Sequence, residues 1–177
     1  ATLFEQRVRP FLVDNQGHKQ VRVRVAGTVV EISASDSSGH FEGTARVAAA
    51  QAQAAAVDGL LQVEVVREPA FDPPVKTTAR LLSRRGVSVI SDLDDTVKIT
   101  QVPDKHELLR NTFLRPFRAA PGMAALYRDW ARRGVSFHFV SSSPWQLFEP
   151  LADFLAEAGF PPATLALKRF SLADSTL

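Results

Sequence analysis

The sequence contains no cysteine, which excludes disulfide bonds and thiolate metal sites. It also has no apolar run near the roughly 18 residues that a membrane-spanning helix needs. Charge of either sign is not in excess, because 21 basic residues oppose 19 acidic ones and give a net charge of +2 at pH 7. That balance argues against nucleic acid as a partner. The 177 residues, of which 45% are hydrophobic, are enough for one large domain or two small ones.

Residues 1–84 carry a pattern that is typical of β-strands. In the segment 21–25 valine alternates with arginine, which predicts a strand with one apolar and one charged face. Residues 63–66 read as a further strand, and the alanine- and glutamine-rich run at 48–56 favours a short helix. We therefore expect a small all-β accessory domain, arranged as an antiparallel sandwich.

From residue 85 to residue 177 the pattern changes to alternating strands and helices. Short apolar runs predict the strands, and a proline near the start and a glycine after the end mark one of the helices. The run at 87–90 is apolar enough for a strand that is buried on both faces. These features predict an α/β domain with a parallel sheet. The expected strands are 87–90, 135–140 and 164–167, and the expected helices are 121–133 and 145–158.

Chemically reactive side chains follow the first two of these strands. Asp92 and Asp94 come after the first strand, and Ser141, Ser142 and Ser143 come after the second. The carboxyl ends of parallel strands line the working crevice of an α/β sheet, so the two groups meet if the strands are neighbours.

This combination suits phosphoryl transfer. One carboxylate can attack phosphorus, and the second can exchange protons with the leaving group and with water. A magnesium ion would let the anionic carboxylate and phosphate approach each other, and serine hydroxyls could hold the phosphate oxygens. The alternative is structural: aspartates are common in loops and at helix N-caps, and a serine run often caps a helix.

The residues Asp92-Leu93-Asp94-Asp95-Thr96 resemble motif I of the haloacid dehalogenase (HAD) superfamily of phosphotransferases. More of the chain resembles the catalytic domain of the actin-patch-protein type phosphatidate phosphatases, and the β-rich region before it resembles the one found in bacterial relatives. The blocks that carry this resemblance are residues 90–98, 109–117 with 121–123, 139–147 and 158–161.

The resemblance implies an HAD-like, Rossmannoid domain that hydrolyses a phosphomonoester, phosphatidate to diacylglycerol, through an aspartyl-phosphate with Mg2+ as cofactor. Asp92 is the implied nucleophile and metal ligand. Asp94 is the implied general acid/base, with its backbone carbonyl on the metal. Ser141, Ser142 and Thr96 are implied to bind the phosphate, and Thr96 is also implied to brace the nucleophile loop.

The resemblance also implies elements that the sequence does not contain. The superfamily has a motif III lysine and a motif IV acidic pair, and the chain reaches Leu177 before any such block. Lys168 is a poor substitute for the motif III lysine. We therefore expect an incomplete, C-terminally truncated catalytic domain with weak Mg2+ affinity and turnover. Two alternatives stay open: a non-catalytic module that binds phosphate or lipid, and a phosphatase for a soluble phosphomonoester.

The segment between motif I and Pro121 is rich in basic residues. Arginines interleave there with Phe113, Leu114 and Phe117, so the segment could meet anionic phospholipid headgroups. The alternative is a short cap whose arginines pair locally. The expected location is the cytoplasm, with peripheral membrane contact. The basic residues of the segment are Lys98, Lys105, Arg110, Arg115 and Arg118.

Overall fold

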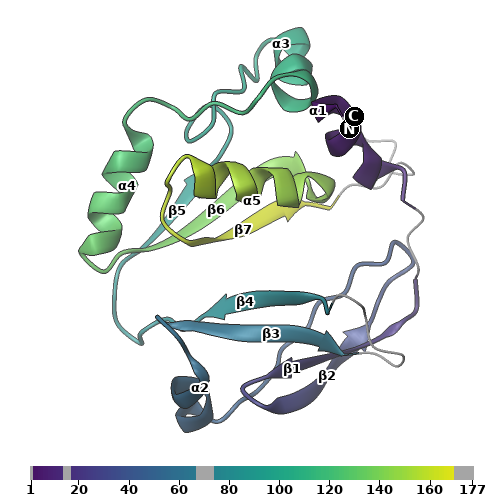
Figure 1. Cartoon of the computed structure of the whole chain (residues 1–177), viewed down its shortest axis with the longest axis vertical. Helices are drawn as coiled ribbons and strands as arrows, with labels where there is room; N and C mark the ends of the chain where they lie inside the picture. Colours follow the sequence, from purple (N-terminus) through teal and green to yellow (C-terminus); the bar gives the residue numbers. More distant parts are fainter. Residues whose placement is uncertain (1, 14–16, 67–73, 170–177) are drawn as a thin grey trace. The chain divides into compact units, whose positions relative to one another are not determined.

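A computed structural model of the chain describes residues 2–13, 17–66 and 74–169 (Figure 1). The chain forms two compact units: Asp14–Arg84 is one, and Ala1–Val13 with Arg85–Leu177 is the other. The first helix, α1 (Leu3–Val8), therefore packs with the second half of the chain, although the sequence pattern groups it with the β-rich first 84 residues. Within the described residues, no helix is long and apolar enough to cross a membrane.

The unit Asp14–Arg84 contains a four-stranded antiparallel sheet in the order β2-β1-β3-β4. The valines of β1 are buried, and Ala52 of the helix packs against Val25 and Leu61, so the predicted strand alternation and the short helix are confirmed. The expected sandwich is not formed by the described residues, because a helix and a loop, rather than a second sheet, cover the apolar face. The elements are β1 (Gln20–Val25), β2 (Thr28–Ala34), α2 (Ala49–Ala55), β3 (Leu60–Val66) and β4 (Lys76–Arg80).

The second unit is built on a parallel sheet in the order β5-β6-β7, which confirms the predicted α/β class (Figure 1). Its neighbouring strands are consecutive in the chain and are joined by helical crossovers, as expected for such units. The elements are β5 (Ser88–Asp92), α4 (Met123–Arg132), β6 (Ser136–Pro144), η3 (Trp145–Leu147), α5 (Phe148–Glu157) and β7 (Ala163–Lys168).

The core of this unit lies on one face of the sheet. Phe137 and Phe139 of β6 are almost fully buried against Tyr127 of α4 and Leu151 of α5. Because both helices contribute to this single core cluster, alternate residues of β5 point away from it. The prediction that the strand is buried on both faces is therefore wrong, and Ile90 is 75% exposed.

Between β5 and α4 lies a helical insert that packs against the N-terminal segment. Its first helix is capped by Asp104, whose carboxylate accepts hydrogen bonds from the next turn. Arg7 of α1 reaches this insert and donates to the carbonyls of Thr112 and Arg115, at 2.7 and 2.8 Å. These contacts explain why α1 belongs to this unit. The elements are η1 (Arg9–Phe11), α3 (Lys105–Leu109) and the π-helical turn η2 (Arg110–Leu114).

Candidate active site

The two groups of polar residues predicted from the sequence meet at the carboxyl ends of β5 and β6. In the parallel register Asp92 lies opposite Val140, so the loop after β5 begins beside Ser141. Ser141 Oγ donates a hydrogen bond of 2.7 Å to Oδ2 of Asp94, across 47 residues of sequence. The structure therefore brings Asp94 and Ser141 together at the predicted edge of the sheet.

Asp94 is the best-connected side chain of the site. Its Oδ1 lies 2.8 Å from Nζ of Lys98 and accepts a hydrogen bond of 2.7 Å from Oγ1 of Thr100. Its Oδ2 accepts from Ser141 at 2.7 Å and from Ser143 at 3.2 Å. A carboxylate has about four lone-pair positions. All of them are thus engaged, and the bond from Ser143 is the longest.

These contacts set the charge of Asp94. Burial alone would raise the pKa of its carboxyl, but the hydrogen bond and the positive charge of Lys98, with the hydroxyls of Ser141 and Thr100, lower the pKa below its ordinary value. Asp94 is therefore a carboxylate at neutral pH.

Asp95 organises the turn that follows. Its backbone φ is 58°, and its carboxylate accepts hydrogen bonds from the amides of Thr100, Gln101 and Val102, at 2.8, 2.7 and 2.7 Å. The slight burial of the group would raise its pKa, but these backbone donors lower it. Asp95 thus closes the loop that carries Lys98 and Thr100 back under Asp94.

Asp92 differs from its neighbours. It is the last residue of β5 and is exposed. Among the described residues none donates a hydrogen bond to its carboxylate, which leaves both oxygens open to a ligand. Thr96 and Ser142 are also exposed, and no hydrogen bond of their side chains occurs within the described residues. The hydroxyls that contact Asp94 come instead from Thr100 and from two of the three serines.

Lys98 is the residue that sequence reasoning placed most differently. It is one of the basic residues of the segment that could meet phospholipid headgroups, but it is 1% exposed and pairs with Asp94, so it does not belong to such a surface. Two arginines of the same segment, Arg110 and Arg115, both pair with Glu107. The structure thus favours the alternative of a cap with locally paired arginines.

The oxygen donors of the site suit a hard cation in part. Across the described ranges of the chain, no group of three or more His, Asp or Glu side chains gathers to hold a metal ion. Asp92 fits as a single carboxylate ligand, because Mg2+ commonly keeps several waters and takes one or two carboxylates together with phosphate oxygens. The side chain of Asp94 is engaged by its four donors, so any contribution from this residue would come from its backbone carbonyl.

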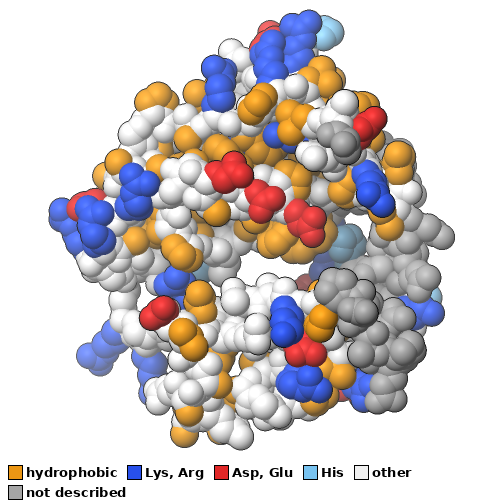
Figure 2. Space-filling model, in the orientation of Figure 1, with side chains coloured by type: hydrophobic (Ala, Val, Ile, Leu, Met, Phe, Trp, Pro, Cys, Tyr) orange, Lys and Arg blue, Asp and Glu red, His pale blue; other side chains and the backbone are white. Residues whose placement is uncertain are grey.

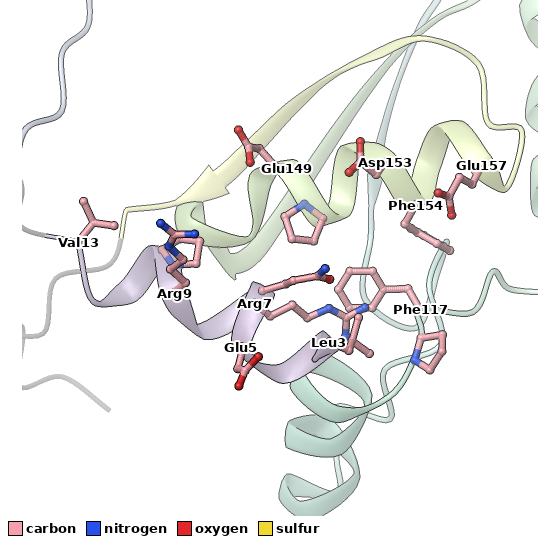
Figure 3. Close-up of a pocket in the computed structure, with 14 residues that line it drawn as sticks. Leu3, Glu5, Arg7, Arg9, Val13, Phe117, Glu149, Asp153, Phe154 and Glu157 are labelled. Atoms are coloured by element: carbon pink, nitrogen blue, oxygen red, sulfur yellow. The ribbon is translucent and has the colours of Figure 1, made fainter. Parts of the chain in front are cut away.

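A pocket of about 770 Å3 lies elsewhere in the same unit, between the N-terminal segment and α5 (Figure 3). Along α5 it is lined by Glu149, Asp153 and Glu157 (Figure 3). In the same orientation as Figure 1, Figure 2 shows a row of acidic side chains where α5 lies. Arg7 and Arg9 line the opposite wall. The pocket is not lined by Asp92, Asp94 or the serines 141–143, so it is separate from the site predicted for phosphoryl transfer.

The fold and the site define an α/β protein with an aspartate nucleophile candidate at the carboxyl end of a parallel strand. Residues 87–177 match the family described as phosphatidate phosphatase APP1, catalytic domain. The chain belongs to this family, which confirms the resemblance seen in the sequence blocks.

Two curated relatives also match. The chain is 36% identical over 106 residues to phosphatidate phosphatase APP1 of Saccharomyces cerevisiae, an alignment that covers 55% of the chain and 18% of that protein. It is 37% identical over 84 residues to an uncharacterized protein of Schizosaccharomyces pombe, which covers 46% of the chain and 14% of that protein. The matched part of the chain thus spans less than a fifth of the length of either relative.

Proposed function

We propose that this chain carries the nucleophile of a Mg2+-dependent HAD-type phosphatase, which converts phosphatidate to diacylglycerol at a membrane surface in the cytoplasm. The observation that carries the proposal is the open carboxylate of Asp92 at the end of β5, two residues before Asp94, whose carboxylate is held in place by Lys98. The proposed substrate is the one named in phosphatidate phosphatase APP1 of Saccharomyces cerevisiae, to which the chain is similar.

The reaction has two steps. In the first, an oxygen of Asp92 attacks phosphorus and the bond from phosphorus to the ester oxygen breaks, while the Asp94 carboxylate takes the proton of the monoanionic phosphate and passes it to the leaving alkoxide. In the second, water attacks the aspartyl-phosphate, its proton passes through Asp94 to the phosphate, and the bond from phosphorus to the Asp92 oxygen breaks, so inorganic phosphate leaves and both carboxylates are restored. Bound Mg2+ would supply positive charge that lets the carboxylate approach the phosphate.

The polar side chains divide between these tasks. Oδ2 of Asp94 is the oxygen suited to proton transfer, because its bond from Ser143, at 3.2 Å, is the longest of the four and the easiest to exchange for water. Ser142 and Thr96 are exposed and are proposed to donate to the phosphate oxygens. Ser141 is proposed to hold the carboxylate of Asp94 in place through its hydrogen bond to Oδ2.

A second candidate function is a non-catalytic module that binds phosphate or lipid. It is favoured by the saturated carboxylate of Asp94 and by the single open carboxylate among the described residues of the site. In that case Asp92 would have no chemical role.

Phosphate release by the longest natural form of the chain separates these functions. The substrates are phosphatidate in phosphatidylcholine vesicles and the soluble monoester p-nitrophenyl phosphate, each with Mg2+ or with EDTA. Mg2+-dependent release from the vesicles supports the proposal. Release from the soluble ester alone would change the substrate class, and vesicle binding without turnover would favour the non-catalytic function.

A further inference from the structure

Lys98 is a buried cation whose position is explained by one acidic partner. At 1% exposure its ammonium group is removed from water, which is costly unless the charge is paired. Among the described residues its ion-pair partner is Asp94, and Nζ lies 2.8 Å from Oδ1. The ammonium also donates to Oγ1 of Thr100 and lies 5.1 Å from the centre of the Phe117 ring.

The surrounding backbone holds Lys98 in this place. Its amide donates to the carbonyl of Leu93 at 2.8 Å, and its carbonyl accepts from the amide of Asp95 at 2.7 Å. Short bridges link its backbone to Asp94 on one side and to Ala119 on the other. The lysine is therefore fixed by the loop itself, independently of its side-chain contact with Asp94.

The two oxygens of Asp94 have different surroundings. Oδ1 contacts Lys98 and Thr100, which are both almost fully buried and belong to the same loop. Oδ2 contacts the serines at the end of β6, where the bond from Ser143 is the longest of the four. The cation thus anchors one oxygen and leaves the other at the open side of the site.

We propose that Lys98 is a positioning residue, which holds Oδ1 of Asp94 and thereby directs Oδ2 toward the place where proton transfer occurs. Its catalytic meaning rests on the proposed function, whereas the pairing that it requires can be measured without turnover. The resemblance to known phosphatases assigns no role to this lysine, which lies inside the motif I block rather than at the motif III position.

The test is a double-mutant cycle of Lys98→Met and Asp94→Asn. Met keeps most of the volume of the lysine stem and removes the charge, and Lys105→Met at the exposed start of α3 is the matched control. Lys98→Met in the wild-type protein leaves the Asp94 carboxylate without its cation, so it should lower the unfolding midpoint. The same substitution made in the Asp94→Asn variant should lower the midpoint less, because no carboxylate is left unpaired. Lys105→Met should leave the midpoint unchanged.

Kinetics of phosphate release in the longest natural form of the chain give the second readout. Lys98→Met should lower kcat on the order of 10- to 100-fold per folded protein with KM within about twofold, because a misdirected catalytic group affects the chemical step. In the Asp94→Asn background the same substitution should have little further effect on kcat.

Two results would overturn the proposal: additive effects of the two substitutions on the unfolding midpoint, or an unchanged kcat in folded Lys98→Met. If Lys98→Met does not fold but the double variant does, the pairing is supported; if neither folds, Lys98 serves the core rather than Asp94. A wild-type protein without turnover would contradict the proposed function, while the unfolding cycle would still decide whether Lys98 acts through Asp94.

Discussion

Ser141 Oγ and Asp94 Oδ2 are joined by a hydrogen bond of 2.7 Å that links the end of β6 to the loop after β5. Ser141 is only 6% exposed, and its Oγ also accepts a bond of 2.9 Å from the amide of Ser143. This serine therefore connects the two halves of the site, whereas its neighbour Ser142 is exposed.

The first prediction concerns the different contributions of Ser141 and Ser142 to stability. Ser141→Ala removes a hydrogen bond to a charged group and should lower the free energy of unfolding by about 1–2 kcal/mol. Ser142→Ala should change it by less than about 0.5 kcal/mol, as expected of a surface substitution. Urea unfolding of the two variants measures the difference, and equal losses would show that Ser141 does not hold the site together.

The second prediction concerns Asp95. Asp95→Ala removes the acceptor of three backbone amides and places a non-glycine residue without a local acceptor at a φ of 58°. The free energy of unfolding should fall by about 2–3 kcal/mol. Asp95→Asn is the matched variant, because it keeps an oxygen for Thr100 and Gln101 and because asparagine tolerates positive φ. If both variants lose the same stability, the loop does not depend on these bonds.

The third prediction is a loss of stability in acid. The folded protein holds the pKa values of Asp94 and Asp95 below their ordinary values, near 3.9 in an unfolded chain. Their stabilising contribution is therefore fully present above about pH 4 and is lost as the pH falls through the lowered folded-state values. Urea unfolding between neutral pH and about pH 2.5 should show this fall. The fall should be smaller in Asp95→Asn, and an identical pH dependence in that variant would contradict the assignment.

The fourth prediction concerns the N-terminal helix. Arg7 is 4% exposed, and the carbon at the centre of its guanidinium lies 3.6 Å from the centre of the Phe117 ring. Arg7→Met removes this contact and both hydrogen bonds to the insert, so the free energy of unfolding should fall by about 2–3 kcal/mol. Arg9→Met, on the exposed side of the same segment, should lose less than about 0.5 kcal/mol. Calorimetry of both variants checks this, and equal stabilities would mean that α1 is not anchored by Arg7.

Some of this architecture follows directly from the sequence. The alternation of strands and helices after residue 85 fixes the parallel sheet, because local apolar runs and a glycine stop mark the boundaries. The same order of elements places Asp92 and Ser141 at one edge of the sheet, since consecutive parallel strands are neighbours.

Other features depend on contacts that local pattern does not encode. The burial of Lys98 is not predicted, because nothing near this residue in the sequence reveals that the loop turns back toward Asp94. The hydrogen bond between Arg7 and the carbonyl of Thr112 joins residues 105 positions apart. Local sequence pattern does not reveal such a contact, so it places α1 with the β-rich residues that follow it directly in the chain. Ile90 reads as core because it is apolar, but its exposure depends on which face the helices cover.

The central claim is that Asp92 is the nucleophile, and Asp92→Asn tests it most directly. Because Asp92 is exposed and has no hydrogen-bond donor within the described residues, the variant should unfold at the same temperature as the wild type. Phosphate release from phosphatidate vesicles by the longest natural form of the chain should fall by roughly a thousandfold or more. Release at the wild-type rate by the folded variant would contradict the account.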